Sequence, residues 1–125
     1  MLSVPSGTKI GVRKSSLTEK QIQKILRRVP EERAFHFYRG IDQPLIESAV
    51  SLTDLCKKVE RVDVQSVAFH QARGDLERWI RDVLGDGELA MSFDRISPSL
   101  CGEALIAEIL REIKARMNQF RVDIP

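Results

Sequence analysis

Apolar residues recur at intervals of three and four along most of the chain, which is the period of an α-helix that buries one face. The longest such stretch, which predicts a helix from about residue 97 to 120, contains Leu105, Ile106, Ile109, Leu110, Ile113, Met117 and Phe120. Shorter stretches with the same period predict helices over about 17–29, 52–61, 64–73, 76–84 and 87–96.

One segment departs from the helical period. Residues 35–38 read Phe-His-Phe-Tyr, and such an alternation of aromatic and polar positions is typical of a half-buried strand. Gly40 and the residues after it supply turn chemistry, and residues 45–50 can return as a second strand. The predicted fold class is therefore mostly α (α+β): a compact domain of five or six helices with one small β-hairpin near residues 34–50, which the helices must cover.

Polar residues ahead of the apolar stretches predict where the helices begin, because their side chains can accept the free N–H groups of a first turn. The predicted start signals are Ser16 with Glu19, Ser51 with Asp54, Asp63, and Ser97 with Pro98. Pro30 is expected to end the first helix, since the residue before a proline disfavours helical backbone.

The triplet Arg73-Gly74-Asp75 is followed eleven residues later by a second Gly-Asp pair, Gly85-Asp86. Glycine readily adopts the left-handed conformation that ends a helix, and aspartate can cap the helix that follows. The repeat predicts two joints between helices. An adhesion loop would be exposed and extracellular, whereas this triplet lies between two apolar helical stretches.

The net charge of +2 conceals an uneven distribution. Residues 1–33 carry eight Lys and Arg residues and three acidic ones, whereas residues 34–125 carry 12 and 15. A basic arm can bind phosphate groups without sequence preference, so nucleic acid is one predicted partner. Its candidate contacts are Lys9, Arg13, Lys14, Lys20, Lys24, Arg27 and Arg28. Residues 1–15 are predicted to form a flexible basic tail ahead of a single domain spanning 16–125.

Four residues are candidate contacts for a ligand or partner: His36, Tyr38, His70 and Arg73. Whether His36 and His70 share a pocket is left open. No catalytic residue, metal or cofactor is predicted, because the histidines and cysteines lack the spacing of metal ligands and no phosphate-binding glycine loop occurs.

Three further interpretations concern single side chains. Trp79 is predicted to anchor the core. Glu77 is predicted to form an ion pair with Arg81, and Glu112 with Arg116, because the two residues of each pair are four positions apart on one helix. Cys56 and Cys101 are predicted to be reduced thiols of a cytoplasmic protein, since neither an export signal nor a membrane-spanning stretch is found.

A set of short motifs occurs in a distinctive order between about residues 30 and 96. The motifs are Phe35–Tyr38, Gly40, Ala49-Val50-Ser51-Leu52, Phe69-His70, Arg73-Gly74-Asp75-Leu76, Trp79-Ile80, Val83–Asp86 and Leu89-Ala90. In these motifs the chain resembles a family of small, largely archaeal proteins and domains of unknown function. The resemblance implies a compact intracellular domain and brings no activity with it.

The sequence favours a non-enzymatic protein-binding or regulatory module. The apolar face of the last helix is wider than one core requires, which predicts a surface there for a protein partner or a second copy of the chain. Two alternatives stay open. One is nucleic-acid binding through the basic arm, and the other is a small-ligand binder or enzyme near His36 and His70.

Overall fold

The computed structural model describes residues 17–120, which form six α-helices, two short helical turns and one antiparallel hairpin. The elements are α1 (Glu19–Leu26), η1 (Glu31–Arg33), β2 (Phe35–Gly40), β3 (Gln43–Ala49), α2 (Leu52–Arg61), α3 (Val64–Arg73), α4 (Asp75–Trp79), η2 (Ile80–Leu84), α5 (Gly87–Asp94) and α6 (Gly102–Gln119). The predicted fold class is confirmed. The predicted basic tail, residues 1–15, lies outside the described residues.

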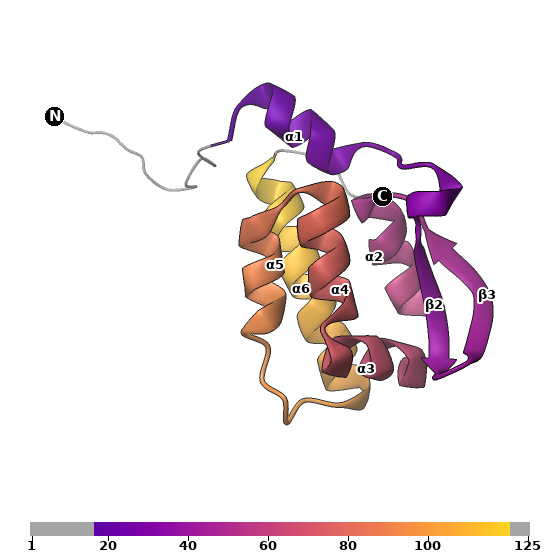
Figure 1. Cartoon of the computed structure of the whole chain (residues 1–125). Coiled ribbons are helices and arrows are strands. Elements are labelled where there is room, and N and C mark those ends of the chain that lie inside the picture. Colours follow the sequence, from indigo (N-terminus) through magenta and orange to yellow (C-terminus); the bar gives the residue numbers. More distant parts are fainter. Residues whose placement is uncertain (1–16, 121–125) are drawn as a thin grey trace, which may run out of the picture.

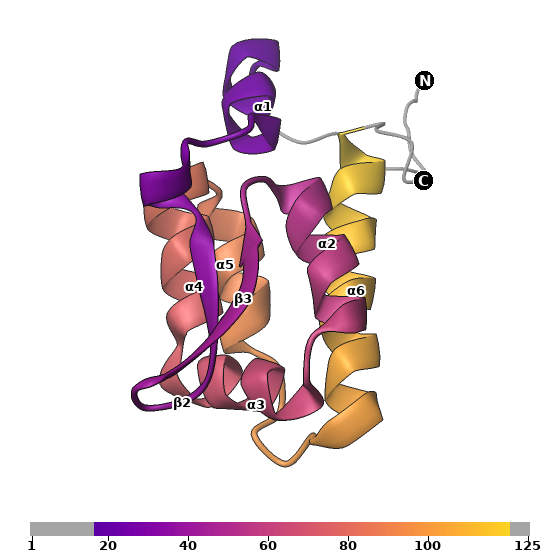
Figure 2. The ribbon, with the colours of Figure 1, turned by 90° about the vertical axis from the view of Figure 1, so that its right-hand side faces the viewer.

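The helices α4, α5 and α6 run side by side, and the hairpin lies along the opposite side of the molecule beyond α2 (Figure 1). Seen from that side, β2 and β3 stand in front of the helices, with α3 crossing at one end and α1 at the other (Figure 2). Two contacts hold the hairpin in place, since α3 packs against β2 and α2 packs against β3. This packing places the edge of β2 that is not paired with β3 beside the corner where α3 meets α4.

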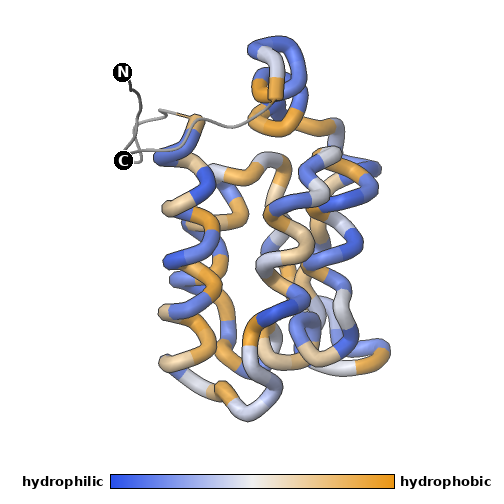
Figure 3. The backbone as a smooth tube through the Cα atoms, turned by 90° about the vertical axis from the view of Figure 1, so that its left-hand side faces the viewer, coloured by the Kyte–Doolittle hydropathy of each residue, from blue (hydrophilic) through white to orange (hydrophobic). Residues whose placement is uncertain are grey.

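Apolar side chains from the hairpin and from helices on both sides of it form one buried cluster. Phe37, Leu55, Leu76, Phe93 and Ile113 are among its fully buried members, and each contributes about 1.5–3 kcal/mol through the burial of apolar surface. The hydropathy along the chain alternates with the helical turns, which gives each helix one apolar side for this cluster (Figure 3).

Trp79 is buried in this cluster, as predicted, and its indole Nε1 donates a hydrogen bond to the carbonyl of Arg33 at 2.8 Å. The indole therefore ties α4 to the segment that enters β2. Buried tryptophans usually find such a partner for their N–H group.

The apolar face of α6 is covered by the domain's own core. Ile109, Ile113 and Met117 are fully buried, and Ile106 and Leu110 are partly buried against the same cluster. The exposed large hydrophobic residues of the described chain all lie on other elements; they are Tyr38, Ile41, Ile46, Val64 and Met91. The width of this face is explained by its contacts with α2, α3 and α5, so the feature that suggested a partner surface on α6 has another cause.

The predicted start of α1 was two residues too early. Thr18 caps the helix, because its hydroxyl accepts the N–H of Gln21 at 3.1 Å while the Gln21 side chain accepts the N–H of Thr18 at 2.8 Å. The helix also ends before Pro30. Arg27 is extended and donates to the carbonyls of Lys24 and Val83, which satisfies the end of α1, and Pro30 precedes η1 instead.

The prediction that Ser97 and Pro98 open the last helix was also wrong. The hydroxyl of Ser97 bonds within a turn, to the hydroxyl and N–H of Ser99, and α6 begins at Gly102 with Cys101 as its cap residue. The other start signals behave as expected, because Ser51 accepts the N–H of Asp54 and Asp63 accepts the N–H of Gln65.

The two Gly-Asp joints are present, but their aspartates differ. Gly74 and Gly85 both end their helices in the left-handed conformation, with φ of 75° and 87°. Asp86 caps α5 by accepting the N–H of Leu89 at 3.2 Å. Asp75 was predicted to cap α4, and this was wrong: Gly74 occupies the cap position, and the Asp75 carboxylate binds other side chains.

Replacing Gly74 with alanine is expected to lower the free energy of unfolding by about 1 kcal/mol. A Cβ at this position meets no atom closer than 3.5 Å, so the cost comes from placing an L-residue at positive φ. Gly87 is the matched control, because its φ is not positive and its Cβ would meet nothing within 4 Å. Gly87→Ala should leave the stability unchanged or raise it. Urea denaturation measures both; equal stability of the two variants would contradict the role of Gly74.

Candidate functional site

A groove lies between β2 and the corner where α3 meets α4, and it has a volume of about 470 Å³. We call it the β2–α3 groove. The four residues that the sequence suggested as ligand contacts, His36, Tyr38, His70 and Arg73, all line it. The two histidines therefore do share a pocket, although one comes from the hairpin and the other from α3. The volume is within the range of small-molecule and peptide side-chain pockets.

Local structure explains this convergence. The alternation in β2 buries the two phenylalanines and leaves His36 and Tyr38 exposed. On α3, Arg73 follows Phe69 by four residues and His70 by three, so its side chain lies next to both on the last turn. Because α3 packs against β2, this face meets the strand, and the tight turn at Gly74 ends the helix beside it.

His70 is built into the wall of the groove. It is 3% exposed, its Nε2 accepts the backbone N–H of Tyr38 at 2.8 Å, and its Nδ1 lies 2.8 Å from the Asp75 carboxylate. An imidazole that accepts at Nε2 carries its proton on Nδ1, so the ring is neutral and donates to Asp75. Burial lowers the pKa of His70 in spite of the opposing effect of Asp75, which favours the same neutral form. Both ring nitrogens are thus occupied.

Asp75 holds this end of the groove together. Its carboxylate accepts a hydrogen bond from His70 at 2.8 Å and one from Arg78 at 2.6 Å, and it forms an ion pair with Nε of Arg73 at 3.2 Å. Burial alone would raise the pKa of the Asp75 carboxyl, but the bond to His70 and the two guanidinium groups hold it below its ordinary value. The aspartate of the Arg-Gly-Asp triplet is therefore an internal ionic partner, which is not the free carboxylate that an adhesion loop presents.

Arg73 has unused hydrogen-bonding capacity. Its side chain is half-exposed, its Nε binds Asp75, and its guanidinium lies 5.0 Å from the centre of the Phe69 ring. Within residues 17–120, no hydrogen bond from its guanidinium is found, and the ion pair with Asp75 is formed through Nε. The guanidinium is thus held on one side by Asp75 and Phe69 and retains donors for another group.

Apolar side chains are exposed around the hairpin end of the groove. Ile41, at the turn between the strands, is 71% exposed and lines the groove, as does Tyr38. Ile46 on β3 is 95% exposed. Exposed apolar residues that cluster beside a groove are typical of a binding surface.

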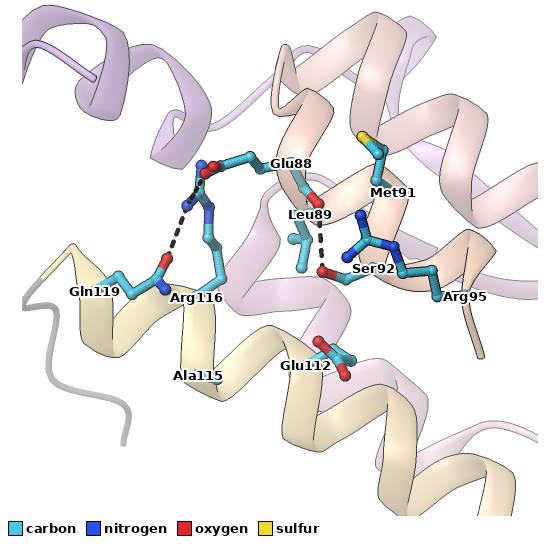
Figure 4. A pocket seen from close by; sticks show the side chains of 9 residues that line it. All are labelled: Glu88, Leu89, Met91, Ser92, Arg95, Glu112, Ala115, Arg116 and Gln119. Carbon is cyan, nitrogen blue, oxygen red and sulfur yellow. Dashed lines mark hydrogen bonds and ion pairs between the residues drawn. The ribbon is translucent and has the colours of Figure 1, made fainter. Parts of the chain in front are cut away.

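A second groove, of about 360 Å³, lies between α5 and α6 and contains none of the predicted site residues. Its polar groups bind one another: Arg116 pairs with Glu88 at 2.6 Å and with Gln119 at 2.7 Å, and Ser92 donates to the carbonyl of Glu88 (Figure 4). The predicted Glu112–Arg116 pair is not formed, since Glu112 pairs with Arg111. Of these contacts, the Arg116–Glu88 pair joins the two helices, and we attribute the groove to their packing.

Arg116 also forms a buried ion pair that the sequence analysis missed. Its Nε and Nη2 donate to the two oxygens of Asp86 at 2.8 and 2.9 Å, and the side chains of Asp86 and Arg116 are only 1% and 6% exposed. The pair connects the second Gly-Asp joint to α6. The predicted Glu77–Arg81 pair on the surface is also present, at 2.7 Å.

The basic arm is only partly within the described chain, because Lys9, Arg13 and Lys14 precede residue 17. Lys20, Lys24 and Arg28 are exposed. Arg27 is half-buried, since its guanidinium donates to the carbonyls of Lys24 and Val83. The predicted nucleic-acid contacts are therefore not equivalent, and Arg27 serves to hold α1 against η2.

Three further findings apply to the described part of the chain. Cys56 is buried and Cys101 exposed, and both are free thiols. No three His, Cys, Asp or Glu side chains are grouped so that they could hold a metal ion. Every helix there is too short or too polar to span a lipid bilayer.

Comparison with known proteins gave no match: no family model fits the chain, and no curated protein or solved structure is significantly similar to it. The resemblance to the archaeal family thus stays a prediction, and the function is argued from the groove itself.

Acidification is expected to destabilise the fold in two separate ranges. Because the pKa of His70 is lowered on folding, the unfolded chain takes up a proton first as the pH falls below about 6.5, and stability decreases there. The lowered pKa of Asp75 adds a further loss of stability only as the pH falls below the ordinary pKa of an aspartate carboxyl, about 3.9. Urea denaturation from neutral to acid pH measures both. In the variant His70→Gln, the decrease in stability below about pH 6.5 should be absent, while the decrease at more acidic pH should remain. A variant whose stability depends on pH as that of the wild type does would contradict the assignment of His70 as buried and neutral.

Proposed function

We propose that the chain is a non-enzymatic binding module, that its binding site is the β2–α3 groove, and that it binds an extended segment of a protein partner. The observation that carries this proposal is that both ring nitrogens of His70 already bind groups of the protein. In this buried histidine of the groove, Nε2 accepts the N–H of Tyr38 and Nδ1 bonds to the Asp75 carboxylate. A general base needs a free nitrogen within hydrogen-bond reach of a substrate.

The composition of the groove supports binding over catalysis. Its lining, within residues 17–120, includes no serine, threonine, cysteine or lysine that could act as a nucleophile. It is rich instead in aromatic side chains, with Tyr38, Phe69 and Trp79 around one arginine. Tyrosine, tryptophan and arginine are the residues that most often carry the binding energy of protein interfaces.

The position of the groove supports an extended partner segment. It follows β2 from Ala34 to the hairpin turn, so a ligand in it would lie beside the outer edge of a two-stranded sheet. Sheet edges can accept extended peptides. The N–H of Tyr38 on β2 already bonds to His70, so the peptide would be held by side-chain contacts in the groove and not by a complete added strand. Ile41 and Ile46 extend the apolar surface beyond the groove, where a folded partner could continue the contact.

Selection of short random peptides displayed with free C-termini tests the proposal. Selected peptides should bind the full chain, and Ile41→Ser should weaken them at least about fivefold, as measured by fluorescence anisotropy, because an interface anchor contributes more than about 1 kcal/mol. Met91→Ser is the matched control, since Met91 is also an exposed apolar residue, 54% exposed against 71% for Ile41, and lies on α5. A failure to select any peptide, or equal effects of the two substitutions, would contradict the proposal.

A second candidate function is nucleic-acid binding through the basic arm. The exposed side chains of Lys20, Lys24 and Arg28 favour it, and Arg28 shares a polar cavity with Lys57 and Lys58. Labelled DNA and RNA should then bind the full chain with a steep dependence on salt, and a chain that starts at Ser16 should bind less. Equal binding by both chains would exclude Lys9, Arg13 and Lys14 as contacts.

A further inference from the structure

We infer that the β2–α3 groove recognises the free C-terminus of a partner polypeptide that ends in an apolar residue, with Arg73 binding the terminal carboxylate. The inference rests on the proposed function and specifies its ligand. It follows from the charge, the rigidity and the lining of one end of the groove.

The charge at this end is not balanced. Arg73 and Arg78 both pair with Asp75, so two guanidinium groups share one carboxylate; Arg73 lines the groove, whereas Arg78 is not part of its lining. The other carboxylate of the lining, Asp42, belongs to the hairpin turn and pairs with neither arginine. An anion is therefore the group that this end of the groove favours.

The free donors of Arg73 suit a carboxylate in particular. A guanidinium presents its N–H groups as a planar fork that matches the two oxygens of a carboxylate. In Arg73 only Nε is used, by Asp75, and the two terminal nitrogens retain their donors. A carboxylate can accept from both, whereas an amide has a single oxygen to offer.

The guanidinium is also fixed before a ligand arrives. Phe69 lies against it at 5.0 Å and Asp75 binds Nε at 3.2 Å, while Asp75 is itself held by His70. A side chain that is already ordered loses little conformational entropy on binding, so more of the interaction contributes to affinity. The buried His70 thus acts as a positioning residue for Arg73 through Asp75.

The rest of the lining specifies an apolar group beside the carboxylate. Tyr38, Phe69 and Trp79 surround the groove and Ile41 lies at its hairpin end. Its volume of about 470 Å³ is sufficient for the last one or two residues of a peptide. A terminal carboxylate leaves the last side chain free to enter this apolar space, whereas the carboxylate of an Asp or Glu side chain uses that side chain to reach the arginine.

Two peptide pools test the inference on the full chain. Each contains N-acetylated short peptides of mixed sequence that end in leucine or phenylalanine, one with a C-terminal carboxylate and one with a C-terminal amide. Trp79 reports binding by fluorescence, because it lines the groove and is the only tryptophan. The carboxylate pool should bind at least about tenfold more tightly than the amide pool, which corresponds to about 1.4 kcal/mol.

Arg73→Gln should remove this difference, since glutamine keeps a donor but not the charge or the fork. Arg81→Gln is the matched control, because Arg81 is similarly exposed, pairs with Glu77 and lies outside the groove; it should preserve the tenfold preference. Circular dichroism and urea denaturation confirm that both variants are folded. Peptides with an internal aspartate and an amidated C-terminus test whether a side-chain carboxylate can replace the terminal carboxylate.

The outcomes distinguish this inference from the proposed function. If the wild-type chain binds both pools equally and Ile41→Ser weakens both, the groove is a peptide site but does not recognise a carboxylate. If the preference survives in Arg73→Gln, or if the internal aspartate restores it, the assignment of a terminal carboxylate to Arg73 is overturned. If neither pool binds and peptide selection also fails, the proposed function falls as well.

Discussion

Asp86→Ala should lower the free energy of unfolding by about 3 kcal/mol. The change removes the partner of a guanidinium that is only 6% exposed, and breaking a buried ion pair from one side typically costs about 3–5 kcal/mol. The lower figure is expected because Arg116 also binds Glu88 and Gln119. Loss of the cap on Leu89 N–H adds to the effect.

A double-mutant cycle with Arg116→Met separates the pair from the cap. The double variant should be destabilised by clearly less than the sum of the single variants, because it leaves no unpaired charge buried. Asp82→Ala is the control, since Asp82 is an exposed carboxylate and its loss should change the stability by no more than about 0.5 kcal/mol. Additive effects in the cycle would show that Asp86 and Arg116 do not act as a pair.

His70→Ala should lower the free energy of unfolding by about 3 kcal/mol for a different reason. The ring packs edge-on against Phe35 and Phe69, with centroids 4.8 and 5.1 Å away, so its removal leaves a cavity. The N–H of Tyr38 also loses its acceptor and Asp75 loses a donor, and unsatisfied partners of this kind cost about 1–3 kcal/mol. Denaturation by urea measures the total.

His36→Ala is the control for this prediction, because His36 is the exposed histidine of the same groove. It should change the stability by no more than about 0.5 kcal/mol. Amide hydrogen exchange adds a local readout, since the Tyr38 N–H should lose its protection in the His70 variant. If both histidine variants were equally stable, His70 would not hold the hairpin to α3.

Local chemistry made most of the fold predictable. The alternation in residues 35–38 predicted the hairpin, and the apolar period predicted the six α-helices, because both patterns are direct consequences of how side chains project from a strand or a helix. The apolar period predicted neither η1 nor the division of residues 75–84 into α4 and η2. Gly74 and Gly85 were predictable as helix ends for the same reason: few residues other than glycine adopt positive φ at low cost.

The wrong predictions concern helix starts at which more than one nearby residue could act as the cap. Ser16 with Glu19 and Thr18 with Gln21 both match a capping box, so the sequence does not decide between them. Asp75 and Asp86 follow a glycine in the same way, yet only Asp86 caps a helix. Asp75 lies beside His70 and Arg73 in the folded chain, and its carboxylate binds these side chains instead of capping α4.

Contacts between distant residues were not predictable from local patterns. Tyr38 and His70 are 32 positions apart, and Asp86 and Arg116 are 30 apart. For the second pair the sequence did contain a signal that was missed, because Arg116 falls on the apolar stripe of α6 between Ile113 and Phe120 and therefore had to be buried. For His70 there was no such signal, and only the packing of α3 against β2 brings the four candidate residues together.

The central claim is that the β2–α3 groove is the binding site, and an NMR titration of the ¹⁵N-labelled full chain with selected peptides tests it most directly. The amide signals of Tyr38, Phe69 and Arg73 and the indole signal of Trp79 should shift and saturate together, while those of α1 and of the α5–α6 groove stay in place. Saturable shifts confined to α6 or α1, with the groove unchanged, would contradict the account.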